Sequence, residues 1–333
     1  MTIRERLEQE ELSRLSPFAA KSALSKGRER PISPDHLRTD FQRDRDRLLH
    51  SKAFRRLQFK TQVFLSPEGD HYRSRLTHTL EVAQVARSIA RALRLNEDLT
   101  EAIALGHDLG HTPFGHIGER TLNRLSSDGF VHGQQSLRVV EVLEGKGGLN
   151  LCWEVRDGIG KHSGGQRAAT LEGRVVAKAD RIAYINHDID DALRGGIISL
   201  DELPADALAV LGRGQGERIE RMIDDTVIHS EGKDEILMGT AVQQATDSLR
   251  RFLFEHVYQD SWRREEEEKC DFVLTTLYHH FMNKPTEMPL EFVELSYLDG
   301  TQRAVLDYLA SMTDRFATRS FNRLYVPGGF SVL

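Results

Sequence analysis

The chain has 333 residues, of which 39% are hydrophobic and 29% charged, and its formal net charge is −6. The composition is ordinary for a globular protein, and the length suffices for one large domain or one domain with an extension. A charged N-terminus without an apolar stretch behind it predicts no signal peptide, and no apolar run approaches the length of a membrane span. The two cysteines stand far apart, as is typical of unpaired thiols in a reducing compartment, so we expect a cytoplasmic protein.

Residues 1–39 mix charge with serine and proline and predict an N-terminal arm that packs on the body of the protein or on another subunit. From Arg38 to Lys60, eight basic residues stand against three aspartates. A basic surface of this kind can receive a polyanion. The simpler interpretation is a helix on which arginine and aspartate pair at helical spacing. Proline and glycine then predict a loop at residues 64–70.

A strong helix is predicted next, because apolar residues between positions 82 and 93 form one stripe at helical spacing. His78 lies one turn before this stripe. Asn96 is the predicted N-cap of the following helix, which ends at His107 and Asp108.

The segment Gly106–Glu119 is the most informative part of the chain, because it holds three histidines and two carboxylates within fourteen residues. So many titratable groups between glycines indicate the centre of a metal-dependent hydrolase. The alternative is a polar helix end whose histidines are satisfied structurally. Thr112 and Pro113 predict an N-cap and a first-turn proline, so that His116 and Glu119 share one face of the helix that follows.

Glycine-rich segments 145–148 and 158–165 predict loops, and a long helix is predicted over residues 171–194, stopped by two glycines. One face of this helix is polar although the opposite face is apolar, which favours the wall of a site over a solvent-exposed face. The polar face contains Asp180, Ala183, Tyr184, His187, Asp188 and Asp191.

The last third of the chain predicts further amphipathic helices at residues 219–228, 240–256, 272–282 and 301–316. Strand signals are few and short. We therefore expect an all-α protein, with a helical core over residues 40–200 and additional C-terminal helices over residues 201–333.

Four residues on separate predicted helices suit one divalent metal ion. They are His78, the adjacent pair His107 and Asp108, and Asp180. Two imidazoles and two carboxylates leave coordination positions for water and for a substrate oxygen, as catalytic metal sites do. This donor set tolerates Mg²⁺, Mn²⁺, Co²⁺, Ni²⁺ or Zn²⁺.

The ordered set His78, His107-Asp108 and Asp180 resembles the signature of the HD-domain phosphohydrolase superfamily. Several flanking motifs narrow the resemblance to the bacterial deoxyguanosinetriphosphate triphosphohydrolase-like proteins, over nearly the whole chain. The matching motifs are residues 15–22, 41–47, 54–57, 60–64, 73–79, 107–119 and 315–319.

The resemblance implies hydrolysis of a deoxynucleoside triphosphate to a deoxynucleoside and intact tripolyphosphate, by attack at the α-phosphorus. It implies that His116 is the general acid, oriented by Glu119. His111 and His132 would then flank the phosphates, and Arg75 would contact phosphate oxygens.

The resemblance also assigns residues to the sugar. Tyr184 would lie under the ring, where it would exclude a ribose 2′-hydroxyl, and Asp188 would lie near the 3′-hydroxyl. Gln62 is expected to contact the sugar as well. The family further implies a homo-oligomer, namely a hexamer, and activation by a second dNTP bound between subunits.

The chain departs from the family pattern at Gly133, where an asparagine is common. The change removes a possible hydrogen bond without touching the metal residues. Two other functions are weighed against the triphosphohydrolase. One is a different HD nucleotidase or phosphodiesterase, and the other is an oligomeric sensor of nucleotides or single-stranded nucleic acid, which the basic stretch motivates.

Overall fold

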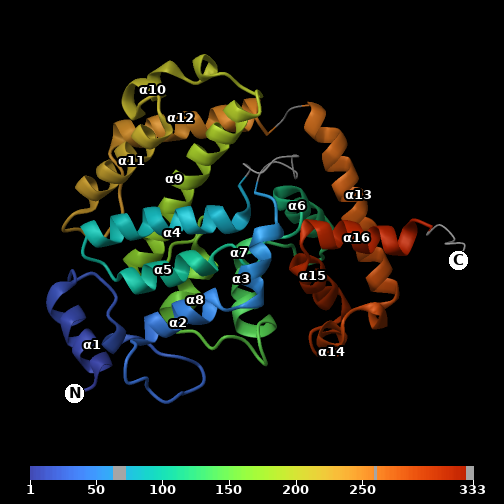
Figure 1. Ribbon diagram of the computed structural model, residues 1–333, viewed down its shortest axis with the longest axis horizontal. Helices are drawn as coiled ribbons and strands as arrows, with labels where there is room; N and C mark the ends of the chain where they lie inside the picture. Colours follow the sequence, from blue (N-terminus) through green and yellow to red (C-terminus); the bar gives the residue numbers. More distant parts are fainter. Residues whose placement is uncertain (63–72, 259–260, 328–333) are drawn as a thin grey trace, which may run out of the picture.

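The structure, a computed structural model, describes residues 1–62, 73–258 and 261–327 (Figure 1). This part of the chain forms sixteen α-helices and no strand, with a single isolated bridge between Thr61 and Ser74. The expected all-α class is therefore confirmed. The predicted loop at residues 64–70 lies outside the described residues. Among the described helices, none combines the length and the apolar character needed to cross a membrane.

The helices fall into an N-terminal and a C-terminal series. The first nine are α1 (Ile3–Arg14), α2 (Asp40–Leu49), α3 (Lys52–Arg56), α4 (Arg75–Ala92), α5 (Glu97–Gly106), α6 (Gly115–Leu125), α7 (His132–Arg138), α8 (Trp153–Lys161) and α9 (Leu171–Arg194). The other seven are α10 (Ala205–Leu211), α11 (Gln215–Ser230), α12 (Thr240–His256), α13 (Ser261–Asn283), α14 (Leu290–Leu298), α15 (Thr301–Ser311) and α16 (Asp314–Tyr325).

The larger hydrophobic core forms where α4 packs against α5 and α9 (Figure 1). The predicted stripe on α4 is buried here, with Val82 and Ile89 fully excluded from solvent. Asn96 accepts the backbone N–H of Leu99 and so caps α5 as predicted. Helix α9 spans the predicted residues 171–194 and carries its apolar face, including Ile182, into the same core.

A second, separate core unites α6 with the C-terminal helices α13–α16, which form the orange and red part of Figure 1. Ile117 and Leu122 of α6 are buried here beside residues of α13 and α15. The predicted helix 301–316 is wrong, because it is two helices. The backbone is extended at Met312 and Thr313, and the Thr313 hydroxyl caps α16 by accepting the N–H of Phe316.

Two other local predictions are also corrected. Helix α6 begins at Gly115 rather than at Pro113, because Phe114 adopts a left-handed conformation with φ of 63° and breaks the turn before it. The glycines of segment 158–165 are not all in a loop, since Gly158 and Gly160 lie within α8. A Cβ at Gly158 would lie 2.5 Å from Cδ1 of Ile103, so glycine permits the close approach of α8 to α5.

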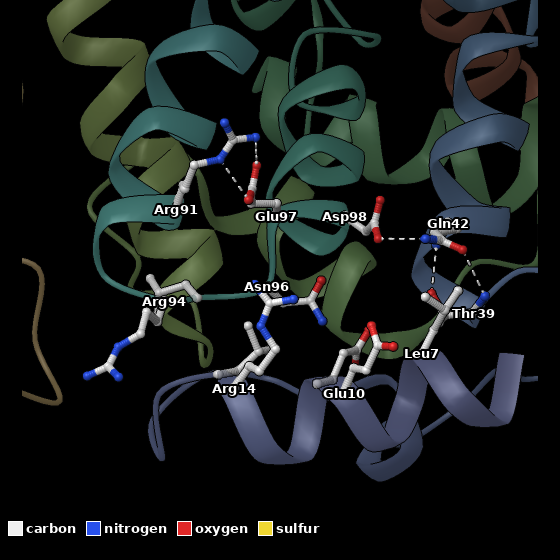
Figure 2. Close-up of a pocket in the computed structure, with 13 residues that line it drawn as sticks. Leu7, Glu10, Arg14, Thr39, Gln42, Arg91, Arg94, Asn96, Glu97 and Asp98 are labelled. Carbon is white, nitrogen blue, oxygen red and sulfur yellow. Dashed lines mark hydrogen bonds and ion pairs between the residues drawn. The ribbon is translucent and has the colours of Figure 1, made fainter. Parts of the chain in front are cut away.

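The N-terminal arm is ordered against the body of the chain. Helix α1 has a capping box, buries none of its residues completely, and borders a cavity of about 320 Å³ beside the turn between α4 and α5. Figure 2 shows Arg14 of α1 facing this turn, where Glu97 pairs with Arg91. Within the arm, the Glu11 carboxylate of α1 accepts hydrogen bonds from the backbone and hydroxyl of Ser22. The backbone N–H of Ala20 donates to Glu172 of α9 at 3.0 Å and so anchors the arm to the body.

Several arginines of the basic stretch pair with aspartates, as the simpler interpretation expects, but within α2 the pairing at helical spacing is that of Arg43 with Asp40. Arg38 pairs with Asp35 and Asp46 at 2.8 Å each, and Arg45 pairs with Asp98 at 2.8 Å. Lys60 is buried and does not face solvent at all. Much of the positive charge in this stretch is therefore neutralised within the chain.

Candidate active site

The predicted metal residues converge between α4, α5 and α9. Nε2 of His78 lies 3.1 Å from Oδ1 of Asp180. Nε2 of His107 lies 3.4 Å from Oδ1 of Asp108 and 3.9 Å from Oδ1 of Asp180. One donor atom from each of His78, His107 and Asp108 lies within 4.8 Å of the others.

The surroundings of His107 and Asp108 prepare them to bind a cation. Nδ1 of His107 donates a 2.6 Å hydrogen bond to the Ala104 carbonyl, so Nε2 carries the free lone pair. That Nε2 atom is buried and has no hydrogen-bond partner in the described part of the chain. Burial opposes ionisation of Asp108, but the charges of His111, His107 and Arg75 hold its pKa well below the ordinary value. A buried, unsatisfied imidazole nitrogen beside ionised carboxylates fits a divalent ion.

Arg75 contacts this cluster through Asp108. It is fully buried, and its Nη1 donates to Oδ2 of Asp108 at 2.9 Å while Nη2 lies 3.4 Å from the Gln62 carbonyl. The side-chain carbonyl of Gln62 is buried and has no hydrogen-bond partner within the described residues. Arg75 is thus positioned by Asp108, and Gln62 leaves an acceptor available near it.

A second set of side chains starts from the same Asp108. Its Oδ1 atom lies 3.1 Å from Nε2 of His111, whose ring stacks on that of His132 with centroids 4.0 Å apart. Glu119 accepts hydrogen bonds of 2.8 Å from both the backbone N–H and Nδ1 of His132. Burial lowers the pKa of His132, but its bond to Glu119 outweighs this effect and the pKa is raised. These contacts form a continuous line from Asp108 to Glu119.

His116 stands at the open end of this line. Its side chain is 63% exposed, and its Nδ1 lies 3.7 Å from Oε2 of Glu119, beyond hydrogen-bond distance. The short hydrogen bonds of Glu119 therefore go to His132 and not to His116. The rings of His116 and His132 together hold the pKa of Glu119 below its ordinary value although burial opposes this.

The residues assigned to the sugar lie on α9 beyond Asp180. Tyr184 is half-buried against the main core, and Asp188 is buried and accepts a hydrogen bond from the hydroxyl of Tyr258. The structure therefore places both side chains on the helix that carries Asp180. It also adds Tyr258, just after α12, as a residue that fixes Asp188.

Comparison with known proteins gives two matching family models. The model described as "HD domain" matches residues 75–185, and the "Phosphohydrolase-associated domain" matches residues 236–323. A "Deoxyguanosinetriphosphate triphosphohydrolase-like protein" of Caldanaerobacter subterraneus subsp. tengcongensis is 58% identical over 98% of this chain and 97% of its own length. Proteins of the same name from Desulfatibacillum aliphaticivorans and Clostridium perfringens are 50% and 47% identical, over 98% of this chain and 99% and 98% of theirs.

The chain belongs to the deoxyguanosinetriphosphate triphosphohydrolase-like family. Its HD domain is a metal-dependent phosphohydrolase fold, and the chain is accordingly a phosphohydrolase. The HD match spans α4 to α9 and so includes His78, His107, Asp108 and Asp180.

In this member of the family, one buried histidine at the centre of the site was not predicted. His162 follows α8, and its Nε2 lies 3.2 Å from Nε2 of His132 while its Nδ1 bonds the Ile159 carbonyl at 2.7 Å. Burial, followed by the charges of His107 and His132, lowers its pKa to about 4. His162 is therefore a neutral link between the four predicted metal residues, His78, His107, Asp108 and Asp180 (the metal-type cluster), and the His132–Glu119 pair. Its only sequence signal is its position at the edge of a glycine-rich segment.

Gly133 lies next to His162 and Ser163. A Cβ at this glycine would lie 3.0 Å from the Ser163 hydroxyl and 3.4 Å from Cε1 of His162. A larger residue at this position would press on the contact between His162 and His132. The departure from the family pattern thus lies beside the histidine network and away from the metal residues.

Proposed function

We propose that the chain hydrolyses deoxynucleoside triphosphates, dGTP and other dNTPs, to deoxynucleoside and tripolyphosphate by attack of water at the α-phosphorus. The observation that carries this proposal is the sharing of Asp108 by two sets of side chains. One set is the metal-type cluster with His78, His107 and Asp180, and the other leads through His111 and His132 to Glu119. A phosphoryl centre between them would meet a cation on one side and proton-carrying imidazoles on the other.

The metal would be held by His78, His107, Asp108 and Asp180. Their nitrogen and oxygen donors accept Mg²⁺, Mn²⁺, Co²⁺, Ni²⁺ or Zn²⁺. When bound, a divalent ion polarises phosphoryl oxygens and lowers the pKa of water from about 15.7 towards about 7. Arg75, held by Asp108, orients that carboxylate and presents a guanidinium to the substrate phosphates.

The remaining residues handle protons and phosphate charge. His116, the most exposed imidazole of the group, protonates the departing O5′ of the deoxynucleoside. Glu119 raises the pKa of His132 through its 2.8 Å hydrogen bond and so favours the charged imidazole. His132 and the stacked His111 flank the phosphate chain. Stabilising the charge that spreads over the phosphoryl oxygens is what this reaction chiefly requires of a protein.

The sugar is bound by α9 and by Gln62. Tyr184 packs beneath the ring and leaves no room for a 2′-hydroxyl, and Asp188, fixed by Tyr258, accepts from the 3′-hydroxyl. The side-chain carbonyl oxygen of Gln62, which has no hydrogen-bond partner among the described residues, supplies a further acceptor. A buried acceptor that waits for a substrate hydroxyl discriminates strongly against analogues lacking that hydroxyl.

The domain bounds, the assembly and its activation are also part of what we propose. We place the HD core at residues 40–200 and the associated region at 201–333, in a cytoplasmic homo-oligomer, namely a hexamer, that a second dNTP activates. Single-stranded nucleic acid is the alternative effector, and the internal pairing of Arg38 and Arg45 gives it no support.

Product analysis tests the proposed reaction. The purified chain is incubated with each of the four dNTPs, singly and mixed, in Mg²⁺ and in Mn²⁺, and the products are resolved chromatographically. Deoxynucleoside with tripolyphosphate supports the proposal, and faster turnover in mixtures supports activation by a second nucleotide. Orthophosphate or pyrophosphate would favour another HD nucleotidase or phosphodiesterase, and no turnover in any condition would favour the sensor.

A further inference from the structure

A strongly basic pocket lies on the flank of α9 that adjoins the candidate active site. The pocket is a cavity of about 360 Å³, which falls within the size range of small-molecule sites. It is bounded by α9, by the segment after α8 and by the connection between α11 and α12. The charged residues lining it are Lys161, Arg167, Arg174, Lys178, Arg181 and Glu235.

The helical spacing of α9 explains the position of this pocket. Arg174, Lys178 and Arg181 recur at steps of four and three residues, so they lie on one face of the helix. Arg181 directly follows Asp180 of the metal-type cluster, and Lys161 directly precedes His162. The basic pocket and the candidate active site are therefore neighbours on the same two pieces of chain.

Two of the five cations that line the pocket form an ion pair with a described residue. Lys161 pairs with Asp157 at 2.5 Å, and Arg167 pairs with Glu235 at 3.0 Å. No ion pair to Arg174, Lys178 or Arg181 is formed by the described residues. Among the lining residues, five cations face the single carboxylate of Glu235, so the pocket attracts negative charge.

Arg174 is held in place without being neutralised. Its three guanidinium nitrogens donate to the backbone carbonyls of Ala168, Asp234 and Ala169, at 2.9, 3.1 and 3.2 Å. Burial, and then the charge of Arg167, lowers the pKa of Arg174. The arginine thus adds a fixed positive charge to the wall, and an anion in the pocket would relieve its repulsion with Arg167.

We propose that this basic pocket binds a polyphosphate chain. Its cations form an array that needs several negative charges within a small volume, which one carboxylate cannot supply. The described residues that line the pocket include no aromatic one, so they offer no stacking surface for a nucleobase or a single-stranded nucleic acid. A free tripolyphosphate and the triphosphate tail of a nucleotide share the required chemistry. This inference rests on the charge and lining of the pocket and goes beyond the proposed catalytic function.

Isothermal titration calorimetry with tripolyphosphate tests the proposal. The full-length Asp108→Ala variant is used beside the wild type, because it removes metal-assisted binding at the candidate active site. Arg75, His111 and His132 remain there, so the pocket variants made in this background are what assign binding to the basic pocket. We expect Asp108→Ala to bind tripolyphosphate, and Lys178→Gln in that background to weaken binding at least tenfold. Lys146→Gln is the matched control, since it removes the same charge from an exposed loop and should leave the affinity unchanged.

Two further arms make the result specific. Arg167→Gln, at the exposed rim, should also weaken binding and serves as the second variant if the half-buried Lys178 is needed for folding. A dNTP is titrated separately: similar affinity for both ligands identifies a site for nucleotide tails, and binding of tripolyphosphate alone identifies a product site.

Three results would overturn the proposal. They are absence of tripolyphosphate binding to Asp108→Ala, unchanged affinity in both Lys178→Gln and Arg167→Gln, and equal displacement by orthophosphate at the same concentration. The measurement involves no turnover, so its failure leaves the proposed hydrolysis untouched. Failure of the hydrolysis likewise leaves the binding result standing.

Discussion

Oδ1 of Asp314 accepts a 2.9 Å hydrogen bond from the backbone N–H of Phe114, although the two residues are 200 positions apart in the chain. The other carboxylate oxygen accepts the backbone N–H of Thr61, also at 2.9 Å. Phe114 has a left-handed backbone, which costs a residue other than glycine roughly 1–2 kcal/mol. The first residue of α16 therefore holds a strained backbone at the start of α6, which carries His116 and Glu119.

Asp314→Ala is expected to lower kcat about 10- to 100-fold while the metal content stays that of the wild type. Without its acceptor, the Phe114 N–H is left buried and unsatisfied, at a cost of about 1–3 kcal/mol, and α6 shifts relative to the metal-type cluster. Asp314→Asn should retain more activity because its amide oxygen can still accept from Phe114. Turnover and metal analysis of both variants test this, and equal loss of metal and activity would contradict it.

His107→Ala and Asp108→Ala are expected to abolish most turnover, by at least about 100-fold, together with bound metal. The reason is that each removes a donor from a buried cluster in which the His107 Nε2 atom has no other partner among the described residues. Elemental analysis and dNTP turnover are measured on the same samples. If either variant keeps wild-type turnover and metal, the assignment of the site is wrong.

His116→Ala and Glu119→Gln are expected to lower kcat about 10²- to 10⁴-fold without loss of metal, because they remove the general acid and the negative charge that raises the pKa of His132. Arg120→Ala is the matched control, as Arg120 lies on the same helix with a 63% exposed side chain. Its turnover should stay within about twofold of the wild type. Wild-type kcat in Glu119→Gln would show that the negative charge of Glu119 has no part in the reaction.

Much of the fold is predictable from local patterns, and the exceptions have physical causes. The stripes of α4 and α9 follow directly from apolar spacing. The break between α15 and α16 escapes such reasoning because apolar periodicity continues across it, and only the extended Thr313 interrupts the helix. The sequence places the start of α6 at Pro113 instead of Gly115, because the left-handed turn at Phe114 is stabilised by the distant Asp314.

A buried carboxyl on α9 predicts a pH-dependent stability. Burial raises the pKa of Glu172 from 4.5 to about 7, where its Oε1 accepts the backbone N–H groups of Ala20 and Asn96. The unfolded chain releases this proton near pH 4.5 and the folded chain does so near pH 7. The free energy of unfolding therefore falls as pH rises between these values, by on the order of 3 kcal/mol from this group.

Glu172→Gln should remove this contribution, since the amide oxygen can accept the same two hydrogen bonds and does not ionise. Between pH 5 and pH 7.5, the melting temperature of the wild type should fall by several degrees more than that of Glu172→Gln. Glu220→Gln, on the exposed face of α11, is the control and should follow the wild type. Identical pH profiles for the wild type and Glu172→Gln would contradict the raised pKa.

In the candidate site, as in the fold, some residues are predictable from local sequence patterns and others are not. His78, His107, Asp108 and Asp180 could be proposed together because each occupies an identifiable place on a predicted helix. The structure brings the first three together, and Asp180 lies 3.1 Å from His78 and 3.9 Å from His107. The supporting groups could not be found, because their partners are remote in the sequence. Buried Lys60 donates to the carbonyls of His111 and Ala310, 51 and 250 positions away. No local pattern encodes such contacts.

The central claim is hydrolysis at the α-phosphorus with release of intact tripolyphosphate, and the most direct test is turnover of a dNTP in ¹⁸O-labelled water followed by mass spectrometry of both products. The account predicts one ¹⁸O atom in tripolyphosphate and none in the deoxynucleoside, since the P–O5′ bond breaks. Label in orthophosphate or pyrophosphate, with a deoxynucleoside mono- or diphosphate as the other product, would contradict it.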